Sequence, residues 1–381
     1  MDDISLSYNL ISCDDHLDLN QLPQDLWTRS LSRKDQARAP HVEERDGMWM
    51  WICEGKPWGH WTGHSKGSNA PKPIYTAFDR GGVTDLTERR PAVPQLRLAD
   101  MDRDGIHTQV IFGPVTSIKN DDQAFGDELH RIYNDWLGEF CTAAPDRLLG
   151  VPMLPLSPES AAEEVHRLAK RGGVRQANLQ IASAEPRLHD RRWEVLWNAL
   201  EETGIVLSWH VTVFLPPAGD PGRGNVAGNF THMKGFITQF LDAFVDLFAW
   251  AILERHPKLK IVIAESGAGW LPWVVEELDY RHWRTWEAEA FYRDKGGIPQ
   301  KTKPSELFKR QIYSTFQQSP VTMRLLEFYG DNLLWATDYP HPDSIWPNSV
   351  ATLKRTMGHL PPAMIKKITH DNAAKLYGLG V

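Results

Sequence analysis

The chain is poor in cysteine and has no long apolar run. Its three cysteines, Cys13, Cys53 and Cys141, stand far apart along 381 residues. Thiols so few and so scattered exclude a disulfide framework and a cysteine-based zinc site, and they are typical of reduced thiols in a cytoplasmic protein. No window approaches the roughly 18 consecutive apolar residues of a membrane-spanning helix, and the N-terminal segment lacks the regions of a signal peptide. We therefore expect a cytoplasmic protein with no membrane partner.

An excess of positive charge is also absent. The chain has 42 Lys and Arg against 49 Asp and Glu, a formal net charge of −7. A nucleic-acid-binding protein would carry a basic stripe, so we expect no nucleic acid partner. With 41% hydrophobic and 24% charged residues, a chain of this length can bury a large core. These values favour a globular enzyme that acts on a small molecule.

Short apolar runs alternate with helical patterns along most of the sequence. This alternation predicts a parallel sheet with crossover helices. Eight such runs suit a closed (β/α)8 barrel, which belongs to the α/β class, better than an open sheet. We therefore expect a single barrel domain over residues 1–381. The predicted strands cover residues 10–13, 108–112, 148–154, 176–181, 205–209, 259–264, 312–315 and 333–336.

Two segments interrupt the alternation. Residues 20–95 are rich in Pro, Gly, Trp and charge, and residues 214–233 contain the run PPAGDPGRGN. Long irregular segments in compact domains are usually functional loops or disordered, and a loop that follows a barrel strand lies on the active-site face. We interpret residues 20–95 as a lid that its tryptophans pack down. The alternative is a surface excursion with no catalytic role.

Potential metal ligands stand where four of the predicted strands end. Side chains at the C-terminal ends of barrel strands point toward the mouth of the barrel, where catalytic groups collect. Asp14 and His16 are two apart on an extended segment, so their side chains share one face. His210, Glu265 and Asp338 follow the fifth, sixth and eighth strands. Because these donors converge only on a barrel axis, they predict a metal centre.

Three of these polar residues also suit proton transfer. Asp338 can be both a ligand and a proton acceptor, and Glu265 can serve as general acid or base if burial brings its pKa toward neutrality. His341 lies three residues beyond Asp338, where it can move protons or orient a substrate. Its alternative is a loop histidine held between two prolines. A bound divalent ion would activate water and polarise a substrate carbonyl or carboxylate.

Six segments resemble the metal-dependent amidohydrolase-related family, which includes aminocarboxymuconate semialdehyde decarboxylase. They are RLADMDRDGI, YNDWLGEFC, PDRLLGVPMLPL, ERHPKLKIVIAESGAGWLP, WATDYPHPDS and DNAAKLYGL. The resemblance runs from about residue 11 to residue 379, and the order of the segments makes it specific. It implies a (β/α)8 barrel, a homo-oligomer such as a dimer, and zinc or another divalent ion. The ligands that it implies are Asp14, His16, His210 and Asp338.

The sequence departs from this family at three positions. Asp14 stands where relatives usually have His or Glu, Glu265 replaces the histidine that decarboxylases carry after strand six, and Ala268 replaces a nearby glutamate. The resemblance implies a hydrolase or a non-oxidative decarboxylase, with Zn as the expected ion. Because of these departures, a decarboxylase reaction in this chain would use residues other than the usual histidine and glutamate.

Two other functions remain open from the same residues. Mixed carboxylate and imidazole ligands also suit iron or manganese, so the set is compatible with a dinuclear non-haem monooxygenase (Fe/Fe or Mn/Fe) that hydroxylates a C–H bond. A barrel with a decayed site would instead be a non-catalytic subunit of a hetero-oligomer. Metal content with oxygen uptake tests the first function, and loss of activity on His210→Ala would exclude the second.

The insertion suggests how a substrate is bound. Arg80, Arg89 and Arg90 are candidate partners for a substrate carboxylate, because a guanidinium binds carboxylates with two parallel hydrogen bonds. Trp61 and the other early tryptophans favour an apolar or aromatic substrate body. His60 and His64 can reach the site if a lid closes over it. Surface charge and solvated loop histidines are the alternatives for these residues.

Overall fold

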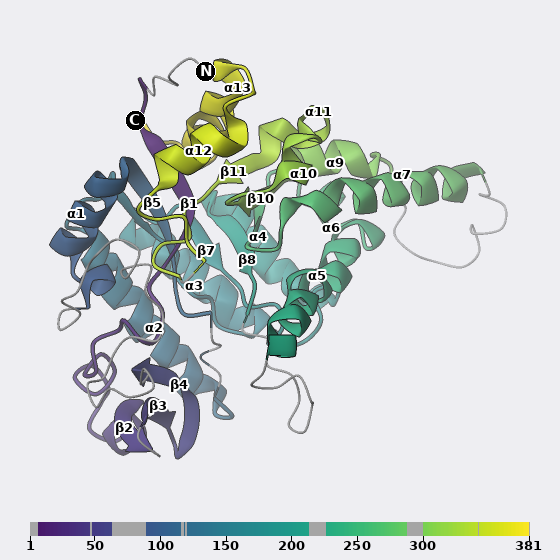
Figure 1. Ribbon diagram of the computed structural model, residues 1–381. Coiled ribbons are helices and arrows are strands. Elements are labelled where there is room, and N and C mark those ends of the chain that lie inside the picture. The colour runs from purple at the N-terminus through teal and green to yellow at the C-terminus, as the bar shows by residue number, and fades with distance from the viewer. Residues whose placement is uncertain are drawn as a thin grey trace. The chain divides into compact units, whose positions relative to one another are not determined.

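The computed structural model describes residues 7–45, 48–62, 89–115, 118, 120–212, 226–287, 300–341 and 343–380. The chain divides into two compact units. Unit 1 comprises residues 1–155 and 335–381, and unit 2 comprises residues 156–334. Figure 1 labels most of the helices and strands of both units.

Unit 1 contains a three-stranded parallel sheet in the order β1-β5-β6. These strands are β1 (Leu10–His16), β5 (Ile106–Phe112) and β6 (Leu148–Gly150). The sequence runs from β1 into the insertion, then through α1 (Pro94–Asp104) to β5 and through α2 (Gln123–Cys141) to β6. α2 buries Tyr133, Trp136, Leu137 and Phe140 on one side, as their helical spacing predicts. Every residue of β1 is buried.

The C-terminal part of unit 1 adds a helical layer and a loop that carries functional side chains. Its helices are α12 (Ser349–Met357), α13 (Pro362–Lys366), a π-helical turn (Lys367–Asp371) and α14 (Asn372–Tyr377). The loop before α12 follows β1: Asp338 N donates to Asp14 O at 2.8 Å, and His16 N donates to Tyr339 O at 2.7 Å. These bonds place Asp338 beside the polar end of β1.

The insertion contains a small antiparallel sheet in the order β2-β3-β4, formed by β2 (His41–Arg45), β3 (Met48–Cys53) and β4 (Lys56–Thr62). The expectation of an irregular segment is wrong for these residues. Trp27 packs edge-on against Trp51 and Trp58, and the indole nitrogen of Trp51 donates to Leu19 O at 2.7 Å. These contacts of the tryptophans hold the small sheet against the rest of unit 1.

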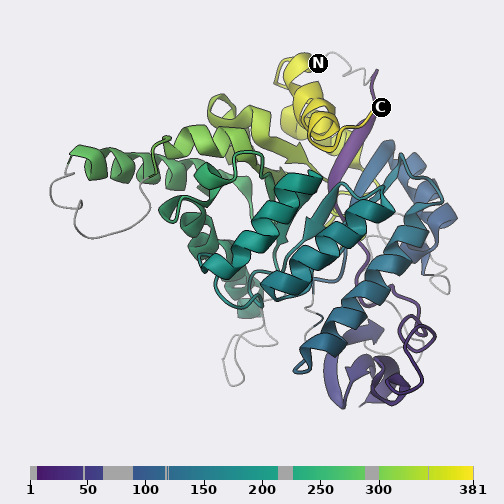
Figure 2. The ribbon, with the colours of Figure 1, turned by 180° about the vertical axis from the view of Figure 1, so that it is seen from behind.

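The small sheet lies beside the N-terminal end of α2, as Figures 1 and 2 show. Arg38 pairs with both Glu54 and Asp122, at 2.6 and 2.9 Å, and Lys56 pairs with Asp121 at 2.6 Å. These side chains are partly or largely exposed, so each pair adds little to stability. Buried indoles and their hydrogen bonds contribute more.

Unit 2 is built around a five-stranded sheet in the order β11-β10-β9-β8-β7. The pairs β7–β8, β8–β9 and β9–β10 are parallel. β8 and β9 are completely buried, as continuous apolar runs in a parallel sheet predict. The strands are β7 (Gln176–Asn178), β8 (Val206–His210), β9 (Ile261–Ala264), β10 (Ile312–Phe316) and β11 (Leu333–Trp335), whose last residue begins the second segment of unit 1.

Helices connect these strands. α3 and α4 pack against each other, and Figure 2 shows them side by side. Residues 226–233, for which the composition predicts an irregular insertion, belong instead to the helix α5, which corrects that expectation. The helices are α3 (Pro158–Arg171), α4 (Glu194–Thr203), α5 (Val226–Ala249), α6 (Ile252–Arg255), α7 (Leu271–Glu287), α9 (Pro304–Gln311), α10 (Pro320–Met323) and α11 (Leu326–Tyr329).

All eight predicted strands are present within one to four residues of their expected bounds. None of the helices in the described part of the chain is both long enough and apolar enough to cross a membrane. The second insertion between residues 213 and 225 lies outside the described residues, as do Arg80 and His64.

A buried carboxylate at the end of α1 gives a testable pH dependence. Asp104 accepts from Ser349 N at 2.9 Å and from Ser349 Oγ at 2.5 Å. Burial raises the pKa of Asp104 to about 6 from 3.8, against the effect of these hydrogen bonds. The native state thus binds this proton more tightly than the unfolded chain does. Protonation of Asp104 therefore stabilises the fold fully below about pH 4, and this stabilisation is lost as the pH rises to about 6.

We expect Asp104→Asn to remove this dependence, because an amide does not titrate. Relative to the wild type, the variant should gain free energy of unfolding between pH 4 and pH 6 and no more above that. Urea denaturation at four pH values measures the difference. Curves that stay parallel across this range would contradict the assignment.

Candidate metal centre

Asp14 and His16 lie at the buried end of β1. Their alternate positions on the strand place both side chains on one face, and Asp14 Oδ1 lies 3.5 Å from His16 Nε2. Both side chains are almost completely buried. Two polar side chains are costly to bury unless each finds partners, so this pairing at a strand end indicates a functional site.

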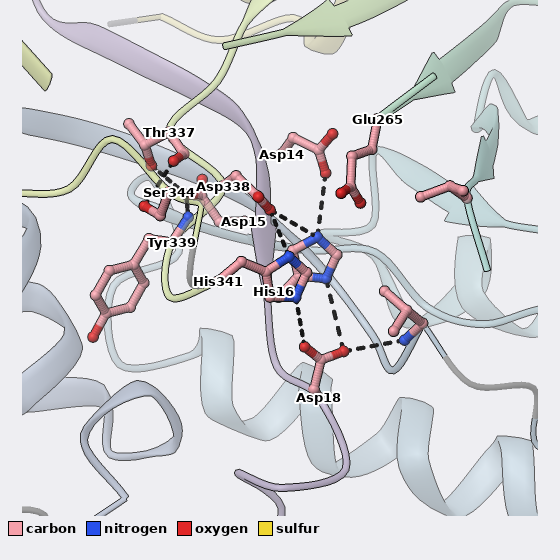
Figure 3. Close-up of polar contacts among 12 residues, drawn as sticks. Asp14, Asp15, His16, Asp18, Glu265, Thr337, Asp338, Tyr339, His341 and Ser344 are labelled. Carbon is pink, nitrogen blue, oxygen red and sulfur yellow. Dashed lines mark hydrogen bonds and ion pairs between the residues drawn. The ribbon is translucent and has the colours of Figure 1, made fainter. Parts of the chain in front are cut away.

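Asp338 approaches the same imidazole nitrogen from the loop after β11. Its Oδ1 lies 3.4 Å from His16 Nε2, and the side chain is fully buried (Figure 3). Asp338 has a φ of +59°, in the left-handed region that non-glycine residues rarely adopt. Strained backbone of this kind clusters at active sites. Burial raises the pKa of Asp338 to about 7, although nearby His341 opposes the rise.

His341 bridges two carboxylates. Its Nδ1 lies 2.9 Å from Asp338 Oδ1 and its Nε2 lies 2.7 Å from Asp18 Oδ2, while its ring stacks on His16 with centroids 3.9 Å apart. Burial alone would lower the pKa of His341, but the two carboxylates outweigh burial and raise its pKa well above the usual value. His341 therefore lies between two carboxylates, within ion-pair distance of each.

The geometry around His16 Nε2 fits a bound ion. Its distances of 3.5 and 3.4 Å to Asp14 and Asp338 are longer than ordinary N–H···O hydrogen bonds. They match the separation of donor atoms that share one ion, each at about 2.0–2.2 Å from it. His16, Asp338 and His341 offer donor atoms within 4.8 Å of one another. With Asp14 and Asp338 both next to His16 Nε2, these three residues form the donor set of unit 1.

Unit 2 holds a second pair of donors. His210 ends β8, and Glu265 directly follows β9 with a φ of +50°. His210 Nδ1 lies 2.8 Å from Val211 O, and because a carbonyl only accepts, this nitrogen carries the proton. Nε2 then carries the lone pair, and it lies 3.3 Å from Glu265 Oε2. This is the tautomer that ligates metals through Nε2.

The predicted substrate-binding residues make other contacts. The Arg89 guanidinium lies 3.5 Å above the Trp61 ring and donates to the carbonyls of Asn20 and Trp61. Trp61 donates from its indole to Leu22 O at 3.1 Å, and Arg90 pairs with Asp100 at 2.5 Å. These contacts hold the insertion in place, and the substrate-binding role of Arg89 and Trp61 stays a prediction.

Two carboxylates of this region were not predicted from the sequence. Asp18 binds His341 and accepts from Val115 N at 3.1 Å, and burial would raise its pKa, but His341 and His16 lower it to about 2. Asp15 instead accepts hydrogen bonds from Thr337 and Tyr339, and burial raises its pKa to about 7. The alternation Asp14-x-His16-x-Asp18 could have predicted Asp18, because residues two apart on an extended segment share a face.

The chain is similar to known enzymes. The family model described as Amidohydrolase matches residues 57–379, most of the chain. A gamma-resorcylate decarboxylase of Rhizobium sp. (strain MTP-10005) is 25% identical over 317 residues, which cover 77% of this chain and 90% of the relative. An amidohydrolase from Mycobacterium avium subsp. paratuberculosis K-10 is 20% identical, with a TM-score of 0.73 over 98% of this chain and 100% of its own.

A further solved structure contains a metal. It is the 5-carboxyvanillate decarboxylase of Novosphingobium aromaticivorans DSM 12444, complexed with manganese and 4-hydroxy-3-methoxy-5-nitrobenzoic acid. It is 18% identical, with a TM-score of 0.66 over 98% of this chain and 97% of its own. The resemblance drawn from the sequence motifs is confirmed, and so is an enzyme of the metal-dependent hydrolase and carboxy-lyase type. The chain belongs to the amidohydrolase family and has the (β/α)8 barrel fold of that family.

Proposed function

We propose that the protein is a metal-dependent, non-oxidative decarboxylase of an aromatic carboxylate. The observation that carries the proposal is the buried set of Asp14, His16 and Asp338, in which carboxylate oxygens lie 3.4 and 3.5 Å from one imidazole nitrogen. The decarboxylase names of its relatives favour loss of CO2 over hydrolysis.

We propose that His210 and Glu265 complete the ligand set, because both follow strands whose ends face the mouth of a barrel. A set of three carboxylates and two imidazoles suits Mn²⁺ well, since carboxylate oxygens favour this ion. Manganese in the carboxyvanillate decarboxylase supports the same choice. Zinc, the ion expected from the sequence, stays a prediction.

The chemistry follows from which residues hold protons. A bound divalent ion would polarise a carboxylate or hydroxyl oxygen of the substrate. Asp338, in its protonated form, would transfer its proton to the ring carbon that bears the carboxylate. The bond between this carbon and the carboxylate then breaks, its electron pair returns to the ring, and CO2 leaves. Asp338 regains a proton from water, and His341 keeps its carboxylate oriented.

One observation favours a second function. The carboxylate of Glu265, 3.3 Å from His210, replaces the usual histidine of the decarboxylases and enriches the site in oxygen donors. Such a set is compatible with two iron or manganese ions and a monooxygenase reaction. Oxygen consumption distinguishes this function, because decarboxylation consumes none.

Release of CO2 from aromatic acids tests the proposal. The enzyme, loaded with Mn²⁺, is incubated without oxygen with gamma-resorcylate and 5-carboxyvanillate as probes, and CO2 and the ring product are quantified. A parallel incubation in air follows oxygen uptake. We expect one CO2 per decarboxylated ring with at least one probe or a related hydroxybenzoate, released at least about a hundredfold more slowly by Asp338→Asn. Oxygen uptake with a hydroxylated product and no CO2 would refute decarboxylation.

A further inference from the structure

The pairing of β1 with the loop after β11 is irregular at Asp338. Asp338 N donates to Asp14 O, but the next ladder bond runs from His16 N to Tyr339 O. Two residues, Asp338 and Tyr339, therefore stand opposite one residue, Asp15. This count defines a β-bulge, a device that re-aims a side chain beside many active sites. Here it coincides with the left-handed φ of Asp338.

A bulge leaves a backbone group without its ladder partner, and a buried N–H without an acceptor is costly. At this bulge the group is Tyr339 N–H, and it donates to Asp15 Oδ1 at 3.1 Å. The hydroxyl of Thr337 donates to the same oxygen at 2.5 Å. The Asp15 carboxylate thus binds the residues on both sides of Asp338 (Figure 3).

Asp15 is itself held in place. Gln109 Nε2 donates to Asp15 Oδ1 at 3.2 Å, and the oxygen of the same amide accepts from Arg97 Nε at 2.7 Å. Arg97 is fully buried and also donates to the carbonyl of His16 at 2.9 Å. The same side chains therefore fix the backbone of both β1 and the loop that carries Asp338.

We propose that Asp15 is a positioning residue: its carboxylate oxygen replaces the missing ladder acceptor and keeps Asp338 in the conformation that brings its carboxylate to His16. The inference rests on the proposed metal site. It predicts that loss of the acceptor lets the strained residue relax, which weakens metal binding without removing any ligand. An acceptor of the same shape should suffice, so Asp15→Asn should behave differently from Asp15→Ala.

The test is Mn²⁺ binding by the full chain, measured by calorimetry at a temperature where each variant is folded. We expect Asp15→Ala to raise the dissociation constant about 10- to 100-fold, the usual effect of losing a residue that supports metal ligands. Asp15→Asn should stay within about threefold of the wild type. Asp104→Ala is the matched control, since it removes another buried carboxylate of unit 1, whose hydrogen bonds go to Ser349, and its constant should not change.

Unchanged binding by Asp15→Ala, or equal losses in Asp15→Ala and Asp15→Asn, would overturn the inference. If Asp15→Ala does not fold, Thr337→Val removes one donor to the same oxygen, and an unchanged constant there would also overturn it. Wild-type Mn²⁺ binding without CO2 release would defeat the proposed reaction alone and leave this inference standing.

Discussion

Replacing His16 with alanine should abolish metal binding. His16 Nε2 is the atom that both Asp14 and Asp338 approach, at 3.5 and 3.4 Å, so its removal takes the central donor from the site. The loss of Mn²⁺ affinity should exceed the roughly 10- to 100-fold effect of losing a supporting residue, and activity should fall to background. Elemental analysis after dialysis measures the metal that each chain retains.

The fold must survive for this result to be informative. His107→Ala is the control, because His107 is a half-buried histidine near the opposite end of β5, where it contacts Thr108. This variant should keep wild-type metal content, and circular dichroism should show both variants folded. A folded His16→Ala enzyme with a full complement of metal would contradict the site.

Replacing Asp338 with asparagine should slow turnover strongly, with a smaller effect on metal binding. The amide keeps an oxygen donor but cannot deliver a proton to the ring carbon. General acid catalysis contributes about 10²–10⁴-fold to rates, so we expect kcat to fall by about that factor. Single-turnover release of CO2 from metal-loaded protein measures the chemical step.

A control for charge lies in the same loop. Asp343 is exposed, and Asp343→Asn removes a negative charge that contributes to the environment of Asp338 without removing a proton donor. Its kcat should stay within about threefold of the wild type, because exposed charges interact weakly. If Asp338→Asn kept more than about a tenth of wild-type kcat, a smaller loss than general acid catalysis provides, Asp338 would not be the acid.

The strands could be predicted well from the sequence for a physical reason. Strands buried on both faces are continuous apolar runs, and Ile261–Ala264 is such a run. Potential metal ligands that follow these runs can be recognised, because a charged side chain next to a buried strand is costly to bury unless it has a partner. Asp14, His16 and Asp338 were found in this way, and the structure brings these three together.

The small antiparallel sheet was missed although a signal existed. Aromatic and apolar residues recur in Met48–Cys53 and Lys56–Thr62 around a turn at Glu54-Gly55, where Glu54 has a positive φ. The many Pro, Gly and charged residues of this segment instead favoured an irregular structure. Packing against Trp27, far away in sequence, supplies stability that no local pattern reveals.

The role of Asp15 could not be predicted, because it depends on tertiary pairing. Sequence alone shows two adjacent aspartates, and strand alternation says only that they point to opposite faces. The bulge at Asp338 arises only when β1 pairs with a loop near the other end of the chain, 324 positions away. The residue that binds a bulge cannot be identified until the register between β1 and this loop is known.

The most direct test of the metal centre is the anomalous diffraction signal of manganese in crystals grown with Mn²⁺. We predict a peak at bonding distance from His16 Nε2, with carboxylate oxygens of Asp14 and Asp338 and the imidazole of His210 as further ligands. A manganese peak that touches none of these side chains, or no peak in protein that releases CO2, would contradict the proposed centre.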